Sequence, residues 1–215
     1  MAAFANGSLT VVAIAGTNAL SIYDWLVEDA DVTLKQPVAW PGAPSGAWIS
    51  EGTQIGLDKL NAMSSGTQSL AAYLAAAAGT GKNRTLIFTG HSLAGALSPT
   101  LALYLFTQGG LSLPAWQAVN VYPTAGYSPG NQAFSQFFTS LFEPTGNTGT
   151  YQVWNRDVWN ALDVVPRAWD YTTLTGLPTL YGNNLNSDAY LDVLGAQILG
   201  QVLSGRITSS CRRAS

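Results

Sequence analysis

The chain has 215 residues, of which 47% are hydrophobic, so it is long and apolar enough to fold as a globular domain with a sizeable core. Charged residues make up only 10%, the formal net charge is -3, and no basic cluster precedes the last residues, which argues against nucleic acid as a partner. A single cysteine, Cys211, excludes an internal disulfide, and a single histidine makes a zinc site unexpected.

The sequence has no run long enough to span a membrane, and residues 1–7 lack the positive segment and long apolar run of a secretion signal. We therefore expect a single domain over residues 1–215, without a transmembrane segment. A weakly charged surface suits contact with a lipid–water interface, but it equally suits an ordinary extracellular surface, so composition does not decide between them.

The first predicted core element is a strand at residues 9–15, where apolar and β-branched residues follow one another as in a buried parallel sheet. It ends at Gly16-Thr17-Asn18, which also fits an ordinary turn in which Asn18 caps a helix. The next predicted elements are a half-exposed strand, a loop and two helices, at residues 31–38, 41–46, 50–63 and 68–78.

The most informative stretch is residues 84–107. A short buried strand is predicted at residues 85–88, Gly90 permits a sharp reversal, and apolar residues recur at helical spacing over 93–106. Ser92 therefore lies on a strand–turn–helix, where its hydroxyl is lifted clear of the sheet and free backbone N–H groups favour a negative charge. The alternative is a serine that merely caps a helix.

Two further strands are predicted after this helix, at residues 117–122 and 151–154. Between them, residues 125–134 read Ala-Gly-Tyr-Ser-Pro-Gly-Asn-Gln-Ala-Phe. Beyond the second strand the chain reads Leu-Asp-Val-Val-Pro over residues 162–166.

Gly90-His91-Ser92-Leu93-Ala94-Gly95 resembles the nucleophile elbow of the class 3 (fungal-type) lipases, in which residue 94 is usually glycine. Residues 125–134 resemble the family's Gly-x-Pro-x-x-Gly-Asn-x-x-Phe segment, out of perfect register, and residues 162–166 resemble its Asp-hydrophobic-Val-Pro segment. The resemblance covers roughly residues 9–170 in the family's order. It implies an α/β-hydrolase fold, with a mostly parallel central sheet and helices on both faces, and a serine–histidine–aspartate triad that needs no cofactor.

The resemblance also assigns roles to individual residues. Ser92 would be the nucleophile, and Asp163 would be the triad acid, with Asp157 as the second choice. A loop-capping carboxylate is the alternative for either aspartate. The backbone N–H groups of Thr17 and Leu93 would form the oxyanion hole.

Residues 18–28 occupy the place of the family's lid. Ile22, Trp25 and Leu26 fall at helical spacing, so they would form an apolar face that covers the serine when closed and meets lipid when open. A helix packed permanently on the core has the same periodicity, and both interpretations stay open.

The triad also needs a histidine C-terminal to Asp163, and the 215 residues contain none there. The single histidine, His91, neighbours the nucleophile on a sharp turn that points the two side chains apart, so we interpret it as structural. Residues 209–215 hold the only cysteine and two of the nine basic residues. Truncation or an altered reading frame would explain both facts. The alternatives are a natural departure in which the base is lost or replaced by Asp188 or Asp192, and a His91 ring that rotates inward.

From these residues we expect a triacylglycerol lipase or carboxylic ester hydrolase that acts on lipid esters through an acyl-enzyme on Ser92. Family resemblance implies secretion, although this chain shows no signal peptide. Two alternatives remain: a hydrolase fold without a working base that serves as a lipid-binding or interaction module, and an esterase that acts on soluble esters.

Overall fold

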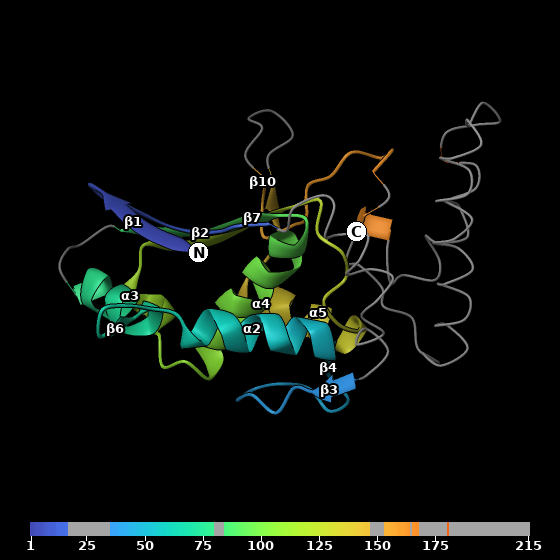
Figure 1. Ribbon diagram of the computed structural model, residues 1–215, viewed down its shortest axis with the longest axis horizontal. Coiled ribbons are helices and arrows are strands. Elements are labelled where there is room, and N and C mark those ends of the chain that lie inside the picture. The colour runs from blue at the N-terminus through green and yellow to red at the C-terminus, as the bar shows by residue number, and fades with distance from the viewer. Residues whose placement is uncertain (17–34, 80–83, 147–152, 164, 168–179, 181–215) are drawn as a thin grey trace.

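Figure 1 shows the computed structural model of the chain, which describes residues 1–16, 35–79, 84–146, 153–163, 165–167 and 180. The strands are β1 (Ala2–Asn6), β2 (Leu9–Ile14), β3 (Lys35–Pro37), β4 (Trp48–Ser50), β5 (Ser64–Ser65), β6 (Gln68–Ser69), β7 (Thr85–His91), β8 (Ala118–Thr124), β9 (Thr145–Gly146) and β10 (Val153–Trp154). The α-helices are α2 (Glu51–Ala62), α3 (Leu70–Gly79), α4 (Leu93–Thr107) and α5 (Gln132–Leu141), and the 3₁₀ helices are η2 (Leu113–Ala115) and η3 (Val165–Arg167).

The central sheet of the described residues has the strand order β1-β2-β7-β8. Strand β7 pairs in parallel with both β2 and β8, and β1 adds an antiparallel edge to β2. The two parallel pairs need crossover connections, and α2, α3 and α4 lie in those connections. The sheet is therefore mostly parallel, as the buried apolar runs predicted.

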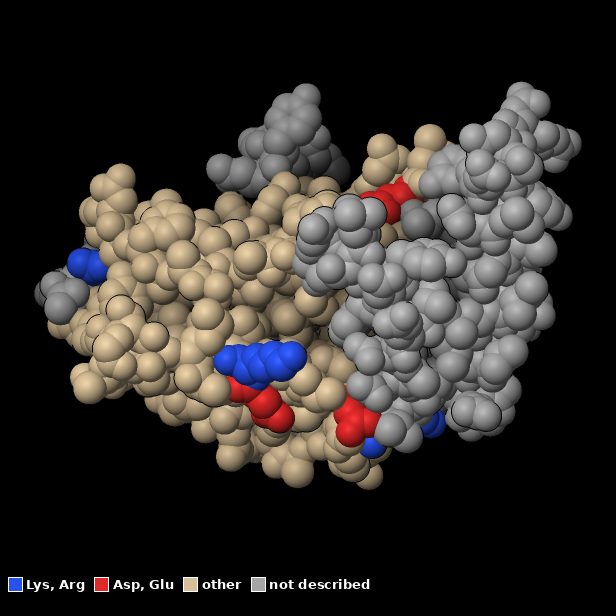
Figure 2. Space-filling view, viewed as in Figure 1, with Lys and Arg blue, Asp and Glu red and all other residues tan. Residues whose placement is uncertain are grey.

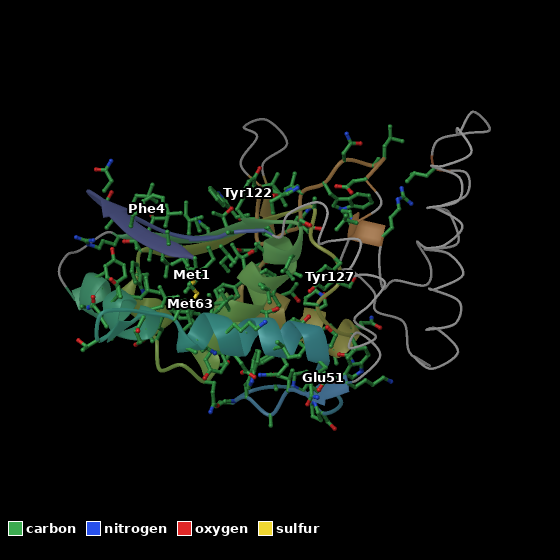
Figure 3. The ribbon with its side chains drawn as sticks, viewed as in Figure 1. Met1, Phe4, Glu51, Met63, Tyr122 and Tyr127 are labelled. Atoms are coloured by element: carbon green, nitrogen blue, oxygen red, sulfur yellow. The ribbon has the colours of Figure 1, made fainter. Side chains whose placement is uncertain are left out.

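Helices α2, α3, α4 and α5 lie on one side of this sheet (Figure 1), so the described residues show α-helices on one of the two faces where we predicted them. Alternate strand residues point toward them and are fully buried, as the period of a strand requires; they are Thr10, Val12, Leu86, Phe88 and Val121. Phe4 and Tyr122 lie on the opposite face (Figure 3), where Phe4 is 54% exposed. The core of the described residues thus lies between the sheet and the helices.

Helix α4 is the central helix of this layer and packs on both β7 and β8. It carries no charged residue, and most of its side chains are buried, as expected of a helix that is apolar all round. On its far side it meets α2, where a Cβ on Gly56 would lie 2.7 Å from Leu97 Cδ2. Glycine at position 56 therefore lets the two helices approach closely.

The predicted helix at residues 50–63 is confirmed as α2, which Ser50 caps by accepting the Thr53 N–H at 3.1 Å. The helix predicted at residues 68–78 begins two residues late. Gln68–Ser69 pairs with β5 as a short strand, and the Ser69 hydroxyl accepts the Ala72 N–H at 3.2 Å at the start of α3. A serine that caps a helix has non-helical backbone, which explains the later start.

Few charged side chains show on the described part of the face drawn in Figure 2, in keeping with the composition, and a basic and an acidic side chain touch near its centre. Within the described ranges, no helix is both long and apolar enough to cross a membrane.

The layering predicts a large difference between two phenylalanines of the same sheet. Phe88→Ala should lower the free energy of unfolding by about 3 to 5 kcal/mol, because it leaves a cavity under α4. Phe4→Ala should cost about 1 kcal/mol or less, because half of its ring is already exposed. Urea denaturation of both variants measures this, and equal losses would contradict the assignment of the two faces.

Candidate active site

Ser92 connects the end of β7 to the start of α4 with φ 60° and ψ -120°, a conformation that a residue with a side chain rarely adopts. The residue is buried, with 5% of its surface exposed. Its side chain makes no capping hydrogen bond to the helix that follows. Ser92 therefore does not cap α4 through its side chain, and the turn has the strained strand-to-helix form that the sequence predicted, although the serine is buried rather than exposed.

Residue 94 is alanine where glycine was expected, and the absence of a side chain at Gly90 explains how the turn accommodates it. Ala94 is fully buried at the start of α4. A Cβ on Gly90 would lie 2.5 Å from both Cβ and the carbonyl oxygen of Ala94. Gly90 therefore supplies the space that the Ala94 methyl group occupies, and strand and helix still approach closely.

The turn is held from the other side by the residues that follow β8. The Ser92 N–H donates to the Thr124 carbonyl oxygen at 3.0 Å. A Cβ on Gly95 would lie 2.6 Å from the same oxygen and 2.7 Å from Gly126 Cα. The first turn of α4 is thus in backbone contact with residues 124–126, and only glycine fits at position 95.

The backbone around Ser92 offers one of the two predicted oxyanion donors. Leu93 is the first residue of α4, so its N–H lies outside the i to i-4 hydrogen bonds of the helix, next to Ser92. The loop after β2 also reaches this place, because a Cβ on Gly16 would lie 2.7 Å from the His91 carbonyl oxygen. Thr17, the next residue and the other predicted donor, lies outside the described residues, as do the predicted lid residues Ile22, Trp25 and Leu26.

His91 is exposed, and its imidazole bonds to the end of β8. Its Nδ1 lies 3.2 Å from the Thr124 hydroxyl, which donates to the Gly90 carbonyl oxygen at 3.2 Å. Since a hydroxyl has one hydrogen, Nδ1 must carry the proton in the bond to Thr124. The ring therefore fastens β7 to β8, an arrangement that fits the structural role we predicted for it.

The two candidate acids occupy different places. Asp163 lies just before η3, where its Oδ1 accepts the Val165 N–H at 3.0 Å and its own N–H donates to Asn160. Asp157 follows β10, and its Oδ1 accepts the N–H of Gly126 at 3.1 Å. Each carboxylate thus accepts a backbone bond, as in the loop-capping alternative, and the triad role of Asp163 stays a prediction. No pattern in the sequence predicted the hydrogen bond between Asp157 and Gly126, which belongs to the residues that contact the start of α4.

The segment singled out after β8 anchors α5. Asn131 caps this helix by accepting the Phe134 N–H at 3.1 Å, and the same oxygen accepts the Trp48 N–H at 3.2 Å. Its Nδ2 donates to the Gly46 carbonyl oxygen at 2.9 Å. The asparagine therefore ties α5 to the β3–β4 hairpin, and the buried ring of Phe134 packs in the core.

Tyr127 lies in the same segment, buried below the sheet and near the start of α2 (Figure 3). Burial raises the pKa of its phenol well above the usual range, and a hydrogen bond with Thr53 opposes the shift only partly. The phenol is therefore neutral at any physiological pH. Within the described part of the chain, no three His, Cys, Asp or Glu side chains are placed to hold a metal ion.

Residues 11–171 match the protein family described as lipase (class 3). No curated protein sequence matches the chain. Among solved structures, M37 lipase superposes with a TM-score of 0.71 and 26% sequence identity, over 97% of this chain and 60% of that one.

Two fungal enzymes share the fold at lower identity. The first is a triacylglycerol lipase from Penicillium expansum, with a TM-score of 0.52 and 21% identity over 75% of this chain and 53% of that one. The second is Rhizomucor miehei lipase in its propeptide complex, with a TM-score of 0.52 and 23% identity over 81% of this chain and 46% of that one. These similarities confirm the predicted α/β-hydrolase fold. The chain spans less than two thirds of the length of each of these three structures.

The contact between Gly95 and residues 124–126 predicts a clear effect of one added methyl group. Gly95→Ala should lower the free energy of unfolding by about 1 to 3 kcal/mol, because backbone atoms on both sides must move. Gly79→Ala is the matched control in α3, where a Cβ meets nothing within 4 Å and the change should be neutral or slightly stabilising. Thermal or urea unfolding of the two variants compares them, and equal stability would contradict the close contact.

Proposed function

The chain belongs to the class 3 lipase family, and on that premise we propose that it is a serine ester hydrolase that acts on carboxylic esters of lipids, with Ser92 as the nucleophile. The observation that carries the proposal is the strained conformation of Ser92 between β7 and α4, without a capping bond from its hydroxyl. A helix-capping serine has no need of such a backbone, whereas a nucleophile does. The likeness to M37 lipase and to a triacylglycerol lipase supports the lipid ester as substrate.

In the proposed reaction the Ser92 Oγ attacks the carbonyl carbon of the ester and gives its proton to a base. The carbonyl oxygen becomes an oxyanion, which accepts hydrogen bonds from the N–H groups of Leu93 and Thr17. The positive end of the α4 dipole, at Leu93, favours the same charge. Collapse expels the alcohol and leaves the acyl group on Ser92, and water then releases the acid. Asp163 would orient and stabilise the protonated base.

The base is the part of the reaction that these 215 residues supply poorly. They contain one imidazole, His91, whose Nδ1 bonds to Thr124 and whose chain neighbour is the nucleophile itself. Without an adjacent base, the Ser92 hydroxyl stays neutral and weakly nucleophilic. Loss of the histidine from a serine triad costs roughly 10⁶ in turnover, while binding and oxyanion donors retain about 10³ to 10⁴ over water.

This placement of His91 favours a second candidate function. A hydrolase fold that binds ester lipids but leaves them intact needs no base. The two functions can be distinguished by measurement, because only a hydrolase site should hydrolyse ester faster when a base is added.

We therefore predict that the purified 215-residue chain hydrolyses p-nitrophenyl butyrate feebly and gains activity from added imidazole. Imidazole in solution can take the Ser92 proton, so the enzymatic rate should rise with imidazole concentration beyond the reaction of imidazole alone. Ser92→Ala removes the nucleophile and should abolish this gain, which makes it the baseline to subtract.

His91→Ala completes the experiment, because it should retain the imidazole-dependent gain if His91 is structural. A strong rate without imidazole, lost in Ser92→Ala but kept in His91→Ala, would show a base that we have not identified. No Ser92-dependent gain, together with binding of a vesicle or emulsion of the ester lipid, would favour the binding module.

A further inference from the structure

We propose that Asp157 is a positioning residue for Ser92: its carboxylate holds the peptide between Ala125 and Gly126 in the conformation that braces the nucleophile elbow. The proposal rests on the proposed function of Ser92, since a positioned nucleophile has meaning only in a hydrolase. Asp157 here acts through the backbone of residues 124–126 and touches no reacting atom.

The first step is the contact between residues 124–126 and the elbow. The Thr124 carbonyl oxygen accepts the Ser92 N–H at 3.0 Å, so it fixes the orientation of the peptide that leads into the nucleophile. A Cβ on Gly126 would lie 2.5 Å from the carbonyl carbon of Gly95, in the first turn of α4. A shift of residues 124–126 is therefore passed directly to the backbone on both sides of Ser92.

The second step is the strain within this brace. In the described residues, the non-glycine residues with positive φ are Ser92, Ala125 and Asn155, at 60°, 50° and 60°. Alanine has no side-chain group that compensates the steric cost of this conformation. Such a residue keeps the conformation only when its surroundings hold it there.

The third step is what holds Ala125. Its N–H donates to the Val158 carbonyl oxygen at 3.0 Å, and the N–H of Gly126 donates to Asp157 Oδ1 at 3.1 Å. The two bonds fix the peptide groups before and after the Ala125 Cα, which together define its φ and ψ. The second bond is the stronger type, because its acceptor carries a charge.

Residues 155–158, which follow β10, also offer a matched comparison. The Asn155 Oδ1 accepts the Val121 N–H at 2.8 Å, and its Nδ2 donates to the Glu143 carbonyl oxygen at 2.9 Å. It therefore fastens residues 155–158 to β8 in the same way, but at the middle of β8 and away from Ser92. Loss of Asn155 should therefore affect the Val121 amide first, and the Ser92 amide less than loss of Asp157 does.

Asparagine at position 157 separates positioning from the triad-acid role that the sequence left open for this residue. An amide oxygen can still accept the Gly126 N–H, so Asp157→Asn should preserve the brace. An amide cannot stabilise a charged imidazole, so with added imidazole as the base the acid role predicts that Asp157→Asn loses as much kcat as Asp157→Ala. Positioning therefore predicts rescue by asparagine, and the acid role predicts none.

The test uses the full 215-residue chain in four forms: wild type, Asp157→Ala, Asp157→Asn and Asn155→Ala. Amide hydrogen exchange, followed by NMR, reports the bonds of Ser92 and Gly126 one residue at a time. We expect faster exchange at both amides in Asp157→Ala, near wild-type exchange in Asp157→Asn, and faster exchange centred on Val121 in Asn155→Ala. The second measurement is the kinetics of p-nitrophenyl butyrate hydrolysis with added imidazole. In Asp157→Ala we expect kcat to fall by about 10- to 100-fold and KM to change little, because a small misplacement of a reacting group has an effect of this size.

Unchanged exchange at Ser92 in Asp157→Ala would overturn the proposal, and so would a loss of kcat in Asp157→Asn as large as in Asp157→Ala. If wild type shows no Ser92-dependent hydrolysis, the proposed function fails, and the exchange data still decide whether Asp157 positions the elbow.

If Asp157→Ala does not fold, the double variant Asp157→Ala/Ala125→Gly takes its place. Glycine adopts positive φ without strain, so it should restore folding and part of the Ser92 protection. Failure to restore that protection would also overturn the proposal.

Discussion

The close backbone approach around Ser92 is the constraint on which the site depends. Strand β7, helix α4 and the residues after β8 come together at distances that leave no room for a Cβ at Gly90, Gly95 or Gly126. Each absent side chain removes a different clash: with Ala94, with Thr124 and with Gly95 itself. The position of Ser92 therefore depends on the absence of side chains at these three glycines. The hydrogen bond from its N–H to Thr124 then fixes the orientation of its backbone.

The rest of the described fold supports this approach mechanically. Helix α4 is apolar all round and lies between the sheet and α2, so it has little freedom to tilt at the end that carries the serine. Asn131 and Ser50 hold the opposite end of the loop after β8, through their bonds around β4. Tight packing far from Ser92 thus preserves the geometry of the turn that carries it.

Local pattern was enough to predict the strand, the turn and the helix around Ser92, because each has its own periodicity and Gly90 marks the reversal. The same holds for the helix at residues 50–63, where Ser50 is a recognisable cap. Pattern failed where pairing is distant. Nothing near residue 157 indicates that its carboxylate bonds to Gly126. Such a contact forms only in the assembled fold. The periodicity of a sequence predicts local elements, and it does not predict which distant residues meet.

The bond between Gly126 and Asp157 joins residues 31 positions apart, and it bears on how the protein is made. A chain synthesised from its N-terminus completes β7, α4 and β8 well before residues 155–158 exist. At that stage the left-handed turn at Ala125 has neither of its later hydrogen-bond acceptors. The sheet and its central helix can therefore form early in translation, whereas the turn around Ser92 is braced only after residues 155–158 have left the ribosome.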